Sequence, residues 1–388
     1  MTRPLAGPQT LLRTLNGRAI LEALARSGPH TRAELMADTG LSRTAVTQVL
    51  RMLEGAGAVA PAGVDRDTRG PAAGRVALHP QLGFAAAVHA DHHTAHVVLV
   101  DPSGAVRAEA HEDFPRADDR VGHIVRLVEG CRRVLKGPVY AAVVGVPGVV
   151  TADGGIRNDE GPDGGAFRSA LAAALGCEVR IENDVNLAAL AELTDAAVAG
   201  LSSFALLMLV DDGLGAGIVI DGALHRGSSG VAGEIMYLPQ SPLPIGAPVV
   251  NDAVVSDLAL TLGGDPDALL GDHLDAAAGG DEVAAQIVTE VARRLVLIAG
   301  TITLVLDPEA FVLSGSASHP VMVDAVDRIA EEYSAQLPVR FVTASFGIEA
   351  PLIGAVGEAA SALRAALFTR ILSPAHKLAH KPAGKTLR

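Results

Sequence analysis

Amide and carboxylate side chains occur at two places in the sequence where they could bind a polyhydroxylated molecule. Asn183 and Asp184 are adjacent, and Glu234 lies in the glycine-bearing segment Gly230–Ile235. Each hydroxyl of a sugar both donates and accepts hydrogen bonds, so a sugar site needs partners of these types. We therefore predict a sugar-binding role for Asn183, Asp184 and Glu234. The alternative is that Asn183 and Asp184 only cap the helix that follows them.

A second group of hydrogen-bonding side chains is typical of DNA recognition. The N-terminal half of the third helix of a helix-turn-helix lies in the major groove, where its outward side chains meet base edges and phosphates. An ordinary three-helix bundle with a polar solvent face is the alternative. We predict DNA contacts from the outward positions of one expected helix, which are Ser42, Arg43, Thr44, Thr47, Gln48 and Arg51.

The elements around these residues fit a helix-turn-helix. The pattern is helical from Asn16, and an apolar stripe over Ile20–Ala25 indicates a first helix. Thr31, followed three residues later by Glu34, forms a capping box that begins a second helix. Gly40 is the glycine expected at its end, and a third helix ends near Gly55. A short second helix, a glycine-bearing turn and a third helix are the parts of this motif.

The segment after the third helix has the composition of a wing. Residues 65–75 are polar, rich in glycine and proline, and lie between two apolar stretches. We predict that Arg69 and Arg75 reach an adjacent minor groove or phosphates, although the segment could also be a mere linker. Residues 1–80 carry ten arginines and six acidic residues, a net charge of +4. Because the whole chain has a net charge of −13, the remaining residues carry −17. Only this basic front end is therefore expected to meet a polyanion.

Two similar units follow, beginning at residues 84–100 and 203–225. Each starts with apolar strands joined at a polar turn and continues with alternating strands and helices. This duplication predicts two α/β lobes with a cleft between them. Glycine-bearing segments mark four strand ends, at Gly145–Gly148, Asp212–Gly217, Leu313–Ser316 and Pro351–Ala355.

The order and spacing of these segments resemble the ROK family of repressors, open reading frames and sugar kinases over almost the whole chain. Residues 181–186 with 188–192, and residues 230–235, resemble that family's sugar-site motifs. Residues 32–35 and 41–46 resemble its regulator branch. The resemblance implies an α/β fold, in which an N-terminal winged helix-turn-helix precedes a two-lobed sugar-kinase-like body of the actin-like, ribonuclease H-like class.

The resemblance also assigns roles to single residues. It adds Gly148 to the ligand-binding set of Asn183, Asp184 and Glu234. We also include Tyr237, which departs from the family pattern but offers a hydroxyl and a ring face to a ligand. In a kinase of this family, the aspartate at Asp184 would be the general base that activates the attacking hydroxyl.

The phosphate-binding turns depart from the kinase pattern. Family kinases read Asp-x-Gly-Gly-Thr where this chain has Asp91, His92, His93 and Thr94. Glycines let backbone amides approach phosphates, and side chains with β-carbons obstruct that approach. Leu214 replaces a hydroxyl residue in the second turn, and residues 313–316 lack one glycine of the nucleotide loop. We therefore expect that kinase activity is lost.

Neither a zinc site nor another metal site is expected. Tyr237 replaces the family's zinc-binding histidine, and residues 238–252 contain no cysteine. Tetrahedral zinc needs thiolate or imidazole ligands, so we predict no structural zinc and no other cofactor. His89, His92, His93 and His96 are close in sequence, but alternating strand positions point to opposite faces, which argues against a metal site there.

The remaining composition indicates a soluble intracellular protein. The two cysteines, Cys131 and Cys177, cannot form a disulfide framework, which favours a reducing cytoplasm. No apolar run has the length of a membrane span, and residues 1–20 lack the core of a signal peptide. We expect a flexible N-terminus (1–15), a winged helix-turn-helix (16–80), two α/β lobes (81–200 and 201–372) and a flexible tail (373–388).

The sequence thus predicts a DNA-binding transcription regulator, acting as a repressor, that a sugar or sugar derivative controls. A homodimer or a dimer of dimers would place two recognition helices about one DNA turn apart on a palindromic operator. One alternative is an active ATP-dependent sugar kinase with an added DNA-binding domain. Another is a DNA-binding protein whose pocket is empty and purely structural.

Overall fold

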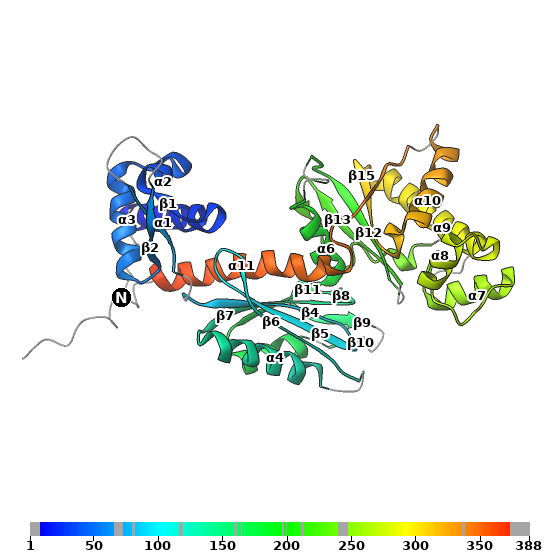
Figure 1. The fold of residues 1–388 in the computed structure, drawn as a ribbon, viewed down its shortest axis with the longest axis horizontal. Coiled ribbons are helices and arrows are strands. Elements are labelled where there is room, and N and C mark those ends of the chain that lie inside the picture. Colours follow the sequence, from blue (N-terminus) through cyan, green and yellow to red (C-terminus); the bar gives the residue numbers. More distant parts are fainter. Residues whose placement is uncertain are drawn as a thin grey trace, which may run out of the picture. The chain divides into compact units, whose positions relative to one another are not determined.

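The computed structural model describes residues 8–65, 73–79, 82–115, 119–158, 161–163, 165–195, 198, 200–210, 213–239, 247–335 and 338–372 (Figure 1). The chain divides into two compact units: unit 1 is residues 1–144, 169–180 and 356–388, and unit 2 is residues 145–168 and 181–355. The sequence predicted two contiguous lobes, 81–200 and 201–372. The division differs because the chain leaves unit 1 twice and returns to it, which local patterns do not reveal.

The N-terminal part of unit 1 is a winged helix. Its elements are α1 (Pro8–Ser27), β1 (His30–Thr31), α2 (Arg32–Thr39), α3 (Arg43–Gly55), β2 (Val59–Asp65) and β3 (Ala73–Leu78). β3 pairs antiparallel with both β1 and β2. The helix-turn-helix is therefore present where the sequence predicted it. α1 begins at Pro8 rather than near Asn16, so a helix occupies about half of the segment expected to be flexible.

Local capping explains where these helices begin and end. The Thr31 hydroxyl accepts a hydrogen bond from the Glu34 amide, and the Glu34 carboxylate accepts one from the Thr31 amide, which is the predicted capping box. Gly40 ends α2 with a left-handed φ of 67°, a conformation that glycine adopts without strain. The Ser42 hydroxyl caps α3 by accepting a hydrogen bond from the Ala45 amide.

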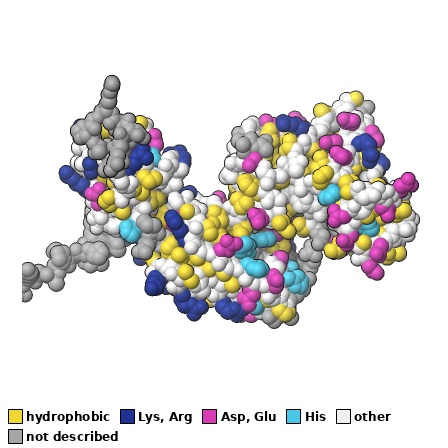
Figure 2. All heavy atoms as spheres, viewed as in Figure 1, with side chains coloured by type: hydrophobic (Ala, Val, Ile, Leu, Met, Phe, Trp, Pro, Cys, Tyr) yellow, Lys and Arg dark blue, Asp and Glu magenta, His cyan; other side chains and the backbone are white. Residues whose placement is uncertain are grey.

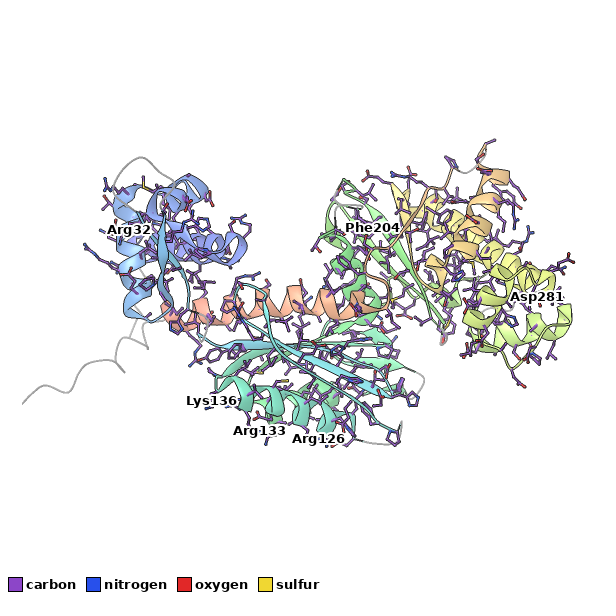
Figure 3. The ribbon with its side chains drawn as sticks, viewed as in Figure 1. Arg32, Arg126, Arg133, Lys136, Phe204 and Asp281 are labelled. Carbon is purple, nitrogen blue, oxygen red and sulfur yellow. The ribbon has the colours of Figure 1, made fainter. Side chains whose placement is uncertain are left out.

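The rest of unit 1 is centred on a five-stranded sheet in the order β11-β7-β4-β5-β6. Its strands are β4 (Phe84–Ala90), β5 (Thr94–Val100), β6 (Val106–Asp113), β7 (Val139–Val146) and β11 (Glu178–Asn183). The helices α4 (Arg120–Leu135) and α5 (Ala166–Leu175) follow in the same α/β alternation. α4 contacts β4, β5 and β6 and carries exposed basic side chains such as Arg133 (Figure 3). Residues 145–168 belong to unit 2, and there β8 (Val149–Val150), β9 (Ile156–Asn158) and β10 (Gly161–Pro162) form a small separate sheet.

The register of the first sheet corrects one expectation. His89 lies directly opposite His96, and His96 lies directly opposite His111. Directly opposite residues on neighbouring strands share a face, so the prediction that His89 and His96 point to opposite faces is wrong. Figure 2 shows histidine side chains gathered among acidic ones over this part of the chain. Among the described residues, no three possible ligands are placed to hold a metal ion.

Unit 2 contains a second five-stranded sheet, in the order β14-β13-β12-β15-β16. Its strands are β12 (Phe204–Val210), β13 (Gly213–Ile220), β14 (Ala223–Leu224), β15 (Ala310–Gly315) and β16 (Phe341–Thr343). Its helices are α6 (Asp184–Glu192), α7 (Asp252–Leu262), α8 (Leu270–Ala278), α9 (Glu282–Leu306) and α10 (Pro320–Tyr333), with short 3-10 turns η1 (Ile235–Tyr237), η2 (Ser316–Ser318) and η3 (Gly347–Glu349).

Alternation along β12 divides the core of unit 2 between the two faces of the sheet. Phe204 and Leu206 belong to the apolar cluster that includes α6, whereas Leu207 and Leu209 belong to the cluster that includes α9. Phe204, which is fully buried, begins the strand (Figure 3). Because β12 is buried on both faces, its sequence is a continuous apolar run, as expected for a central strand.

The last described helix, α11 (Ala350–Leu372), contributes residues to both units. By length and composition alone, residues 347–371 could cross a membrane, which is weak evidence for a span. Within unit 1, however, Leu363 and Leu367 are buried in the protein, and Arg364 donates a hydrogen bond to the Pro102 carbonyl oxygen. Phe368 and Ile371 pack against the core of the winged helix. We interpret α11 as a helix packed within the protein.

Candidate functional site

The recognition helix α3 exposes most of the side chains that the sequence assigned to DNA. Ser42, Arg43, Thr44, Gln48 and Arg51 are exposed, whereas Thr47 is half-buried. The Thr47 hydroxyl donates to the Arg43 carbonyl oxygen. The opposite side of the helix is buried through Val46, Val49, Leu50 and Leu53. Arg43, Thr47 and Arg51 recur every four residues and therefore lie in one row on the helix surface.

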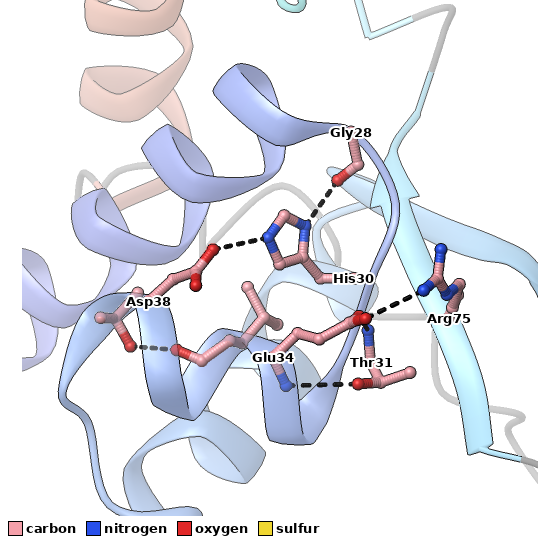
Figure 4. Close-up of polar contacts among 8 residues, drawn as sticks. Gly28, His30, Thr31, Glu34, Asp38 and Arg75 are labelled. Carbon is pink, nitrogen blue, oxygen red and sulfur yellow. Dashed lines mark hydrogen bonds and ion pairs between the residues drawn. The ribbon is translucent and has the colours of Figure 1, made fainter. Parts of the chain in front are cut away.

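The wing residues have different outcomes. Arg75 lies on β3, where its guanidinium donates to the Glu34 carboxylate over 2.9 Å (Figure 4). The structure thus gives Arg75 a partner within the protein. Arg69 lies outside the described residues.

Asn183 lies at the junction of β11 and α6, where unit 2 places the expected sugar-binding residues. Its amide oxygen accepts from the Asn186 backbone amide over 2.9 Å and caps α6. Its amide nitrogen donates to the Gly148 carbonyl oxygen over 3.1 Å. Asn183 therefore caps the helix and also holds Gly148 beside it. Asp184, the first residue of α6, accepts from the Val185 amide. Capping and ligand binding remain compatible because each side chain keeps further hydrogen-bonding capacity.

Close backbone contacts fix the position of Glu234. A β-carbon at Gly230 would lie 2.1 Å from the Val150 carbonyl oxygen, and one at Gly233 would lie 2.0 Å from that of Ala216. Both glycines also have positive φ angles, 82° and 98°, so only glycine fits at either position. The loop is held further by the Ala216 amide, which donates to the Gly233 carbonyl oxygen.

Glu234 and Asp184 interact electrostatically within unit 2. Burial raises the pKa of the Glu234 carboxyl, and the negative charge of Asp184 raises it further. This coupling shows that the two carboxyls, which are separated by fifty positions in the sequence, lie near one another. Tyr237, three residues later, is exposed at the end of η1. The donor set near Tyr237 does not fit a tetrahedral zinc ion, because a phenol stands in the histidine position and residues 238–252 contain no thiolate.

Sequence reasoning missed an ion pair beside the candidate sugar site, in which the carboxylate is buried and the guanidinium-bearing side chain is 41% exposed. Glu182, whose side chain is 4% exposed, accepts hydrogen bonds from the Arg226 guanidinium over 2.8 and 2.6 Å. Its other oxygen accepts from the side-chain amide of Asn186 in α6. Glu182 therefore connects the segment that contains Arg226 to the first turn of α6. β11 alternates polar and apolar residues over Glu178–Glu182, so no local sequence pattern marks Glu182 as buried.

The glycines of β13 serve packing rather than a phosphate turn. The segment is a strand that pairs with β12, not a loop. A β-carbon at Gly215 would lie 2.8 Å from the Val185 side chain, and one at Gly217 would lie 2.5 Å from that of Ala189. Both contacts are with α6, so these glycines let that helix approach the sheet closely.

The turn that resembles a phosphate loop in unit 1 is filled by its own aspartate. One Asp91 carboxylate oxygen accepts from the backbone amides of His93 and Thr94, each over 2.6 Å. The other oxygen accepts from the Thr94 hydroxyl. Two amides that a phosphate loop would offer to an anion are thus already hydrogen-bonded to a carboxylate.

A pocket of about 540 Å³ lies elsewhere in unit 2, at the ends of β12 and β15. Gly315, Ser316, Ser318 and His319 line it, together with residues of α8 such as Asp275. Gly315 has a φ of 64°, and the Ser318 hydroxyl donates to its carbonyl oxygen over 2.7 Å. The segment that resembles a shortened nucleotide loop therefore lines part of this open pocket.

Replacing Glu234 with glutamine is expected to make stability less dependent on pH. The pKa of Glu234 in the folded protein lies above the ordinary 4.5. The carboxyl therefore contributes fully to the free energy of unfolding below about pH 4.5, and this contribution is lost as the pH rises through the pKa of the folded protein. The wild-type melting temperature should therefore fall relative to that of Glu234→Gln above pH 4.5. Thermal unfolding from pH 4 to pH 8 measures this, and parallel curves for the two proteins would contradict it.

Comparisons with known proteins agree with this geometry. The ROK family model matches residues 86–361, and the model described as bacterial regulatory protein, arsR family, matches residues 18–60. The DNA-binding transcriptional dual regulator NagC of Escherichia coli strain K12 is 26% identical over 247 residues, 61% of this chain and 60% of that regulator. The chain spans 46% and 60% of the length of the first two curated relatives it matches.

Solved structures show the same fold. The crystal structure of a ROK family transcriptional regulator, a homologue of the E. coli MLC protein, has a TM-score of 0.73 at 20% identity and covers 94% of this chain and 99% of that one. A ROK family glucokinase from Streptomyces griseus, in complex with glucose and AMPPNP, has a TM-score of 0.60 at 24% identity and covers 71% of this chain and 99% of that one. With the family model spanning most of the described body, the chain belongs to the ROK family.

Proposed function

We propose that this protein is a DNA-binding transcription regulator, acting as a repressor, whose ROK body binds a sugar or sugar derivative. The observation that carries the proposal is the exposed row of hydrogen-bonding side chains on α3, in a winged helix joined to a ROK body. The proposed partners are double-stranded operator DNA and a second copy of the chain, which would supply the second recognition helix of a palindromic site. The proposed location is the cytoplasm.

The proposed effector site consists of Asn183, Asp184 and Glu234, with Gly148 and Tyr237 at its edge. Two carboxyls, an amide and a backbone carbonyl supply the mixture of donors and acceptors that vicinal hydroxyls require. The name of the E. coli relative, N-acetylglucosamine repressor in strain O157:H7, supports a sugar-derived ligand. A thermal-shift screen of sugars and sugar phosphates, with and without DNA, tests the site. If no compound shifts the melting temperature, the pocket is purely structural.

The proposal includes loss of kinase activity. The residues that replace the kinase glycines after Asp91, together with the apolar Leu214, support it, because β-carbons obstruct the approach of backbone amides to phosphates. The cavity beside Gly315 favours the rival function, a sugar kinase that still holds a nucleotide. A coupled assay for ADP release over a hexose panel decides between the two. Turnover that Asp184→Asn abolishes would establish the kinase, since Asp184 would be its general base.

Replacing Arg51 with alanine is expected to weaken DNA binding about tenfold at matched salt, because an exposed arginine on a recognition helix contacts bases or phosphates. Arg43→Ala should act in the same direction. The measurement is fluorescence anisotropy with a duplex that the wild-type protein selects from a random-sequence pool. Arg133→Ala on the exposed surface of α4 is the matched control and should leave the affinity unchanged. Unchanged affinity in both α3 variants would remove α3 as the recognition helix.

A further inference from the structure

A polar network joins the wing strand to the start of the helix-turn-helix (Figure 4). Arg75 on β3 donates to Glu34 Oε1 over 2.9 Å, and Glu34 Oε2 accepts from the Thr31 amide over 2.7 Å. Thr31 lies on β1, directly opposite Arg75 in the sheet. One glutamate therefore binds the second helix, the first strand and the wing strand together.

We propose that Arg75 and Glu34 are positioning residues for DNA binding, and that their ion pair holds the wing against α2 while neither residue contacts DNA. This inference rests on the proposed function. It reassigns Arg75, which the sequence predicted to touch the minor groove or phosphates. A wing reaches DNA only at one orientation of β3 relative to the recognition helix, so a bond that fixes this orientation acts on affinity indirectly.

Geometry and charge support the positioning role. The guanidinium of Arg75 and the carboxylate of Glu34 are each about two-fifths exposed, so water screens the pair only in part. Hydrogen bonds from Thr31 and the positive charge of Arg75 lower the pKa of Glu34, which is thus ionised at neutral pH. The same carboxylate completes the capping box of α2. The pair therefore connects the wing to a helix end that is itself fixed.

The sign of one substitution separates the two roles. Glu34→Gln removes a negative charge from a DNA-binding domain, and charge alone predicts tighter binding. The glutamine oxygen still accepts from the Thr31 amide and keeps the capping box, whereas the charged contact with Arg75 is lost. We expect Glu34→Gln to weaken binding about fivefold, measured by anisotropy with the pool-selected duplex. Equal or tighter binding would overturn the proposal.

The salt dependence separates positioning from phosphate contact. The logarithm of the binding constant falls linearly with the logarithm of the salt concentration, and each lost phosphate contact makes this slope shallower by about 0.9 per chain. Arg75→Gln is expected to weaken binding by a similar factor at every salt concentration, with an unchanged slope. Arg51→Gln, the matched control on α3, should lower the affinity and make the slope shallower. A slope reduced by about 0.9 per chain in Arg75→Gln would show that Arg75 contacts a phosphate.

A double variant and a folding control complete the test. If the two residues act through one bond, Glu34→Gln with Arg75→Gln should weaken binding no more than either change alone. Additive losses would contradict a shared role. Circular dichroism and thermal unfolding must show that each variant is folded, and Thr31→Ser, which keeps the capping hydroxyl, should bind like the wild type. Failure of the wild-type protein to enrich any duplex would instead refute the proposed function.

Discussion

Replacing Gly354 with alanine is expected to lower the free energy of unfolding by about 3 kcal/mol and to abolish binding of the proposed sugar ligand. A β-carbon at this position would lie 1.9 Å from the carbonyl oxygen of Leu187. Leu187 belongs to α6, and backbone atoms cannot move aside as a flexible side chain does. The start of α11 must therefore separate from α6, which carries Asp184 and, as its cap, Asn183.

The same helix provides a matched control for this substitution. Gly357, one turn further along α11, is exposed, and a β-carbon there would have no neighbour within 4 Å. Gly357→Ala should stabilise the protein by about 0.5 kcal/mol, since alanine favours a helix over glycine. Urea unfolding and isothermal titration with the ligand found in the thermal-shift screen measure both variants. A Gly354→Ala protein as stable as Gly357→Ala would show that the tight contact is absent.

The second large effect is expected at Arg226. Arg226→Gln leaves the Glu182 carboxylate without its charged partner at 4% exposure, and we expect a loss of about 2 kcal/mol in unfolding free energy. Ligand affinity should fall as well, because Glu182 also accepts a hydrogen bond from Asn186 in the first turn of α6.

A double-mutant cycle tests this pair. Glu182→Gln combined with Arg226→Gln removes both charges and keeps hydrogen-bonding groups of similar size, so it should recover part of the lost stability. Arg293→Gln provides a surface control, because Arg293 contacts Glu290 at 3.6 Å on an exposed part of α9. Its effect should stay within about 0.5 kcal/mol. If Arg226→Gln is as mild as Arg293→Gln, Glu182 does not depend on this partner.

Features that depend on neighbouring positions could be predicted from the sequence. The capping box of Thr31 and Glu34, the glycine that ends α2 and the cap at Ser42 are all set by residues three or four positions apart. The three helices of the winged domain and its two wing strands, β2 and β3, follow from these signals and from apolar periodicity. The exposed row on α3 was predicted for the same reason, except that Thr47 is half-buried.

Features that depend on strand register or on distant partners could not be predicted in this way. Arg75 and Glu34 are separated by 41 positions, and only the pairing of β3 with β1 brings them together. The alignment of His89 with His96 also requires the register. Gly215 and Gly217 resembled a phosphate turn because a glycine needed for close packing and a glycine needed for a loop look the same in a sequence.

The Asp91 turn has a consequence for the evolutionary history open to this protein. Glycine at positions 93 and 94, where the family kinases have it, would remove two β-carbons but would leave the Asp91 carboxylate on the same two amides. Leu214 differs from the family kinases as well, so the departures lie in two separate segments of the chain. If kinase activity has been lost, as we propose, its recovery would require coordinated changes in both segments.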